Sequence, residues 1–154
     1  MSHFRVIEIS LSHVPVSRTR EELNIYEDHL FLSRSDWGGE PVDDYGYALE
    51  RIKDELRKVA TVNRRKRTIR FRSRNAVKNA YLKSLNTTFR KHKARLKEGV
   101  CRHYELRHAI DDICGIGDLF HTGYCQTGGQ LIEDYLNGYL PQTVHIGTII
   151  DAHF

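Results

Sequence analysis

The stretch TVHIGTII, Thr143–Ile150, is apolar on both of its alternating faces, a pattern typical of a strand buried inside a sheet. Near the other end of the chain, FRVIEISL, Phe4–Leu11, is rich in β-branched residues and also predicts a strand. The patterns between these two strands are mainly helical. We therefore expect an α+β fold: a single compact domain over residues 1–154, in which three to four helices pack with a small sheet that includes the N- and C-terminal strands.

Three segments have the spacing of amphipathic helices. Apolar residues on one face predict a helix over 43–62. A shorter helix is expected over 102–114. Another follows the Thr-x-x-Gln capping box of Thr127–Gln130 and ends before Gly138.

A second long helix is expected between Asn75 as its N-cap and Gly99 as its stop. Its apolar stripe includes Tyr81 and Phe89, which we expect to pack in the core rather than to stack on bases. Asn86–Thr88 is a run of poor helix formers, so the sequence leaves open whether the helix is broken or kinked there.

Residues 19–42 are less clearly patterned. Thr19–Glu22 has the form of a capping box, which favours a helix, whereas the apolar residues that follow fit a hairpin equally well. Both interpretations remain open. Ser33–Val42 contains Gly-Gly, Pro and small polar residues, and is expected to be a loop.

Composition limits the class of protein. The 154 residues are 40% hydrophobic, which is enough for a packed core. No apolar run approaches the roughly 18 residues of a membrane-spanning helix, and Glu8 interrupts the hydrophobic N-terminal stretch. Three Cys, an odd number without close pairing, do not describe a disulfide framework. We expect a cytoplasmic protein that binds no membrane.

Charge is distributed very unevenly along the chain. The net charge is only +4, yet residues 56–97 contain 16 Lys and Arg and no Asp or Glu, a formal charge of +16. The remaining residues carry 8 basic against 20 acidic side chains, or −12. A solvated surface normally mixes both signs, because like charges held together repel. This basic central segment between acidic flanks is the strongest indication of function in the sequence.

Within that segment, Thr68–Arg74 alternates strictly between polar and apolar residues. A strand here places Arg70, Arg72 and Arg74 on one face and Ile69 and Phe71 on the other. We expect a ladder of arginines that faces outward.

These features predict a non-catalytic nucleic-acid-binding protein, with RNA and DNA both open. Lys and Arg that neutralise phosphates release condensed counterions, and the Arg fork binds phosphate in a bidentate manner. The predicted contacts come from the central strand and helix: Arg64, Arg65, Lys66, Arg67, Arg70, Arg72, Arg74, Lys78, Lys83, Arg90, Lys91 and Lys93.

Two other classes of function remain open. The protein could be an interaction module, such as an inhibitor or assembly factor, whose basic face docks on an acidic or nucleic-acid-loaded partner. It could instead be a metal-assisted nuclease or phosphodiesterase. The candidate residues for that chemistry are His103, His108, Asp111, Asp112 and His121. A zinc site formed by Cys114, His121 and Cys125 is less favoured, because the usual C-x2-C and H-x3-H spacings are missing. We expect no cofactor, and a homo-oligomer remains open.

Overall fold

A seven-stranded mixed sheet forms the centre of the computed structural model, which describes residues 3–25 and 39–153. The strand order is β3-β4-β7-β1-β5-β6, and β2 pairs with β7 beside β4. The strands are β1 (His3–Ser10), β2 (Glu40–Pro41), β3 (Ala60–Asn63), β4 (Thr68–Phe71), β5 (Leu119–His121), β6 (Cys125–Gln126) and β7 (Thr143–His153).

Strand β7 organises the sheet. It pairs in antiparallel fashion with β1 along one edge and with β4 and β2 along the other. β1 also pairs with β5, in parallel. Both strands expected near the ends of the chain are therefore confirmed, and both lie inside the sheet, where apolar residues on two faces are needed.

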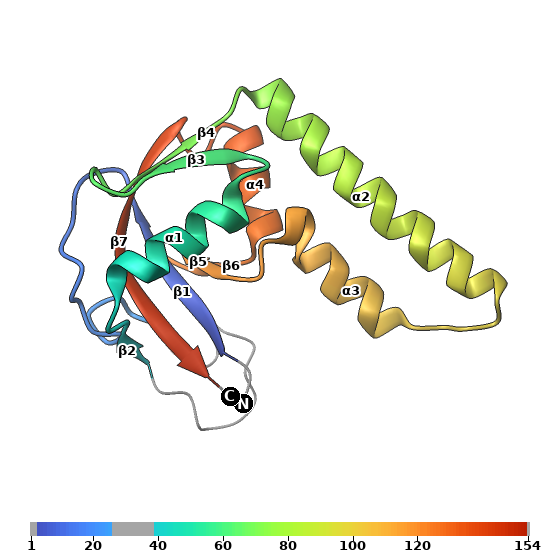
Figure 1. The fold of residues 1–154 in the computed structure, drawn as a ribbon, viewed down its shortest axis with the longest axis horizontal. Helices are drawn as coiled ribbons and strands as arrows, with labels where there is room; N and C mark the ends of the chain where they lie inside the picture. The colour runs from blue at the N-terminus through green and yellow to red at the C-terminus, as the bar shows by residue number, and fades with distance from the viewer. Residues whose placement is uncertain (1–2, 26–38, 154) are drawn as a thin grey trace.

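Four helices complete the described fold: α1 (Tyr45–Leu56), α2 (Arg74–Lys97), α3 (His103–Asp111) and α4 (Gly128–Leu136). α1, α4, the first turns of α2 and the short 3-10 turn η2 (Ile113–Gly115) cover one face of the sheet (Figure 1). The main core lies between these helices and the sheet, and it includes Ile7, Ile52, Leu131 and Ile149. The expected α+β class is confirmed.

The N-terminal loop, residues 11–25, crosses part of the opposite face of the sheet. Leu23 and Ile25 pack there on Val6, Ile150 and Ala152, in a smaller apolar cluster.

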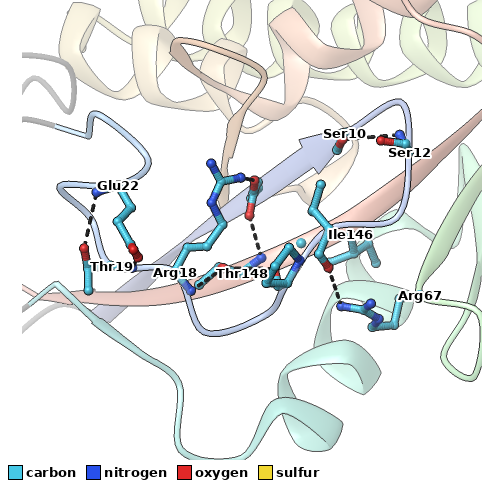
Figure 2. Close-up of polar contacts among 12 residues, drawn as sticks. Ser10, Ser12, Arg18, Thr19, Glu22, Arg67, Ile146 and Thr148 are labelled. Carbon is cyan, nitrogen blue, oxygen red and sulfur yellow. Dashed lines mark hydrogen bonds and ion pairs between the residues drawn. The ribbon is translucent and has the colours of Figure 1, made fainter.

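A half-buried ion pair lies beside this cluster. The buried Glu8 carboxylate on β1 pairs with Arg18 at 2.5 Å and accepts a hydrogen bond from the Thr148 backbone N–H at 2.9 Å. Figure 2 shows Arg18 beside Thr148, whose hydroxyl accepts from the Arg18 backbone. Gly147 makes room for this group, since a Cβ there would lie 2.6 Å from Glu8 Cδ and 2.7 Å from Val14 Cγ2.

The helix expected over 43–62 is too long. α1 ends at Leu56, and Ala60–Asn63 form the edge strand β3, paired with β4. Val59 and Val62 continue the helical spacing, but β-branched residues also favour strands, and pairing with β4 decides the outcome.

α2 differs from expectation in two respects. Its N-cap is Ser73, whose side chain accepts from the Ala76 N–H, so Asn75 lies inside the helix. The helix is continuous through 86–88, where the Thr87 hydroxyl donates to the Lys83 carbonyl at 2.9 Å. Gly99, with φ of 82°, ends the helix as predicted.

The uncertain region 19–42 is partly described. The capping-box hydrogen bonds of Thr19 and Glu22 form, but they close only a single turn (Figure 2). The expectations for 26–38 lie outside the described residues. The prediction of a loop over Ser33–Val42 is wrong for Glu40–Pro41, which form the short strand β2.

The capping box of Thr127 and Gln130 begins α4 as predicted. The helix expected over 102–114 is shorter, because α3 ends at Asp111 and the 3-10 turn η2 follows. None of the helices in the described ranges has the length and hydropathy needed to span a membrane.

α2 and α3 form a helical arm, defined here as residues 82–111. The first turns of α2 are anchored on the body, where Val77 is buried and the Tyr81 hydroxyl donates to Glu133 of α4 at 2.9 Å. The rest of α2 projects from the body, and α3 returns beside it (Figure 1).

Candidate nucleic-acid interface

The fold divides the basic central segment between two ends of the molecule. Arg64–Arg67 form the β3–β4 turn, whereas Lys78–Lys97 lie on α2. In Figure 1 the β3–β4 turn is at the left and the free end of α2 at the right, so the 16 basic residues do not form one continuous patch.

The β3–β4 turn is partly neutralised. Arg64 pairs with Glu50 of α1 at 2.8 Å. Arg67, in the left-handed region with φ of 51°, donates to the Val14 carbonyl at 3.1 Å and contacts the His13 ring. Arg67 therefore fastens the N-terminal loop to the turn, while Arg65 and Lys66 are exposed.

The predicted arginine ladder does not form. Arg70 is exposed on β4, with Ile69 and Phe71 buried behind it as expected. β4 ends at Phe71, however. Arg72 donates to the carbonyl of Arg57 at 2.7 Å, and Arg74 lies in the first turn of α2, 5.9 Å from the centre of the Tyr135 ring. The three arginines occupy three different local structures.

The strongest concentration of basic side chains is on α2. At 100° per residue, six polar residues from Asn79 to the end of α2 fall between about 160° and 240° from the buried Val77, on the side of the helix turned away from the core. All six are exposed, and we call them the outward face: Asn79, Lys83, Asn86, Arg90, Lys93 and Lys97.

The cations of the outward face are uncompensated. α2 contains no Asp or Glu, and within residues 3–25 and 39–153 none of its four outward cations forms an ion pair. The other side of α2 differs, because Arg95 pairs there with Glu105 of α3. Lys91 lines the groove between the two helices, and Lys78 is exposed to one side.

The residues proposed for metal-assisted chemistry are dispersed. His103, His108 and Asp111 lie on α3, Asp112 follows it, and His121 is buried on β5. Burial raises the pKa of the Asp112 carboxyl. In the part of the chain that the structure describes, no three His, Cys, Asp or Glu side chains are grouped to hold a metal ion. This arrangement gives the nuclease hypothesis no support.

Sequence reasoning missed a buried charge cluster. Arg5 of β1 pairs with Glu55 of α1 at 2.6 Å and with Asp118, just before β5. Burial, together with the neighbouring Asp118 charge, raises the pKa of Glu55 to about 7. These residues are far apart in the chain, so no local pattern connects them.

Beside this cluster is a hollow of about 390 Å³ with acidic walls, which include Glu40, Asp43, Asp44 and Asp151. Carboxylates repel phosphate, so this side of the body is unsuited to a polyanion.

Sequence reasoning also missed the sidedness of α2. Lys83, Arg90 and Lys97 are seven residues apart, as are Asn79, Asn86 and Lys93. That regularity could have been found in the sequence, since two helical turns nearly restore the same direction.

Comparison with known proteins adds nothing to these observations. No family model matches the chain, and no curated protein or solved structure is significantly similar to it.

Proposed function

We propose that this protein binds double-stranded DNA through the outward face of α2. The observation that carries the proposal is a set of four exposed cations that form no ion pair within the described residues, interspersed with two asparagines, on a helix without a carboxylate. Such a surface attracts phosphate by releasing condensed counterions.

The length of the helix favours a duplex. Lys83 and Lys97 are 14 residues apart, or about 21 Å along the axis. The major groove of B-form DNA is about 12 Å wide and admits an α-helix. Cations at the two ends of the outward face can therefore reach phosphates on both sides of the groove.

The middle of the outward face suits the base edges. Asn86 and Arg90 lie between the end cations. Asn can bind adenine and Arg can bind guanine through paired hydrogen bonds in the major groove. The major groove of A-form RNA is deep and narrow, which disfavours entry of a helix.

The test is binding of a 20-base-pair DNA duplex, measured by fluorescence anisotropy over a salt series. With phosphate contacts from Lys83, Lys93 and Lys97, log K should fall against log salt with a slope of about −2.7. The triple variant Lys83→Gln, Arg90→Gln, Lys97→Gln removes two of these contacts and should lower the magnitude of that slope by about 1.8.

The matched control is Arg64→Gln, Arg65→Gln, Lys66→Gln, which removes the same charge from the β3–β4 turn. We expect the control to bind much more tightly than the α2 variant. Equal losses in the two variants, tighter binding of an RNA duplex of the same sequence, or no binding at low salt would overturn the proposal.

A further inference from the structure

A row of exposed apolar side chains runs along α2 beside the outward face. Leu82, Phe89 and Leu96 are 42%, 47% and 48% exposed, and each is seven residues from the next. Leu85 and His92 alternate with them three residues further on. This spacing of three and four is that of the a and d positions of a coiled coil.

Within the described residues, the arm leaves Leu82, Phe89 and Leu96 exposed. α3 packs on another side of α2, where Thr88 and Arg95 line the groove with Leu106 and with His92 of the row. Only Leu85 of the row packs against the main core. Single exposed apolar residues are ordinary, but three in heptad register form a continuous seam.

We propose that this seam binds an amphipathic helix of a partner protein, with leucine-type residues at its a and d positions and Asp or Glu beside them. The positive charge of α2 indicates that the partner helix is acidic. Lys93 flanks Phe89 and Leu96, is exposed and forms no ion pair within the described residues, and α2 supplies no carboxylate. Charges beside an apolar seam select the partner helix.

The same charges disfavour a second copy of the chain as the occupant. Two α2 helices that met along this seam would bring Lys and Arg against Lys and Arg, without acidic residues between them. Like charges across an interface suppress that pairing.

The width of the seam disfavours a lipid surface. A helix that lies in a membrane interface buries a broad apolar face. Here the outward face begins immediately beside Phe89, with Asn86 and Lys93 exposed on the adjoining row. A single row of apolar side chains fits one helix.

This inference does not rest on DNA binding, because the apolar row carries it and only the flanking Lys93 also belongs to the outward face. The probe is a 21-residue helical peptide with Leu at a and d and Glu at e and g. Its two controls are the same peptide with Lys at e and g, and a scrambled acidic peptide. Binding of each to the whole chain is measured by fluorescence anisotropy.

We expect saturable binding of the acidic amphipathic peptide alone, weakened at least tenfold by Phe89→Gln with Leu96→Gln. The control is Leu11→Gln with Tyr139→Gln, which alters exposed apolar residues outside the arm and should not weaken binding. Circular dichroism should show that both double variants keep their helix content.

Equal binding of the scrambled or Lys-containing peptide would overturn the inference, as would an unchanged affinity in the Phe89 and Leu96 variant. Two other results would assign the seam to another occupant. One is a dimer, seen by sedimentation, that the same variant dissociates. The other is binding to vesicles of phosphatidylcholine and phosphatidylserine that the variant abolishes.

Discussion

The sheet and the helical arm use charge in opposite ways. In the sheet, Glu8 is buried and paired with Arg18, and Arg5 is shared between Glu55 and Asp118. On the arm, the cations of the outward face are exposed and form no ion pair within the described residues.

The difference shows which charges hold the fold together. A buried charge that loses its partner is strongly destabilising, whereas an exposed charge contributes little to stability. Charges in the sheet should therefore control unfolding, and charges on the arm should control binding. The predictions below test this separation.

The largest effect is expected from Gly147→Ala. The added methyl group would overlap Val14 and the buried Glu8 carboxylate and would displace that carboxylate from Arg18, so the free energy of unfolding should fall by about 3 kcal/mol. Urea denaturation followed by circular dichroism measures it.

Gly46→Ala is the matched control for that substitution. Gly46 lies in α1, and the nearest atom to its added Cβ is 3.5 Å away. Because alanine favours helix over glycine, this variant should gain about 0.5–1 kcal/mol. A loss in Gly46→Ala equal to that in Gly147→Ala would show that the Glu8 site is not special.

A change in pH is expected to have a smaller effect on stability. Burial and the Asp118 charge raise the pKa of Glu55 in the folded protein to about 7, above its ordinary 4.5, despite the opposing charges of Arg5 and Arg51. The folded state then holds a proton that the unfolded state releases. This contribution to stability is complete below about pH 4.5 and is lost as the pH rises through about 7.

Glu55→Gln isolates that contribution, because glutamine resembles the protonated carboxyl. When the pH rises from 5 to 8, the wild-type protein should lose more stability than the variant. The urea concentration at the midpoint of unfolding measures this loss. Parallel curves for the two proteins would exclude Glu55 as the titrating group.

The smallest effect on stability is expected on the arm. Lys83→Gln, Arg90→Gln, Lys97→Gln should change the free energy of unfolding by no more than about 0.5 kcal/mol, since exposed positions contribute little. The same urea series measures it. A loss of several times that size would mean that the outward face supports the fold, and the separation of the two regions would be wrong.

The sequence predicts the parts of the fold that depend on local pattern. β-branched residues identified β1, apolar residues on both faces identified β7, and the capping box identified the start of α4. The prediction failed where strand pairing overrides local preference, as in β3, whose Val62 also fits the α1 spacing. β5 and β6, with three and two residues, are too short to show a period.

The candidate site was predicted only in part. The excess of basic residues was evident, and most of the α2 cations were named in advance. The sequence did not predict that the α2 cations lie far from the β3–β4 turn, because that separation depends on the path of the chain. Phe89 was expected in the core, but it is 47% exposed, since α2 extends beyond the body that would cover it.

The central position of β7 also affects how the chain folds during synthesis. β1, β2 and β4 are all made before the strand with which they pair. At typical ribosome speeds, roughly 7–27 s separate Ser10 from Thr143. During that interval the β3–β4 hairpin and α2 can form from local contacts, while the edges of β1 await a partner. The sheet is therefore expected to close late and in one step, when β7 enters between strands already made.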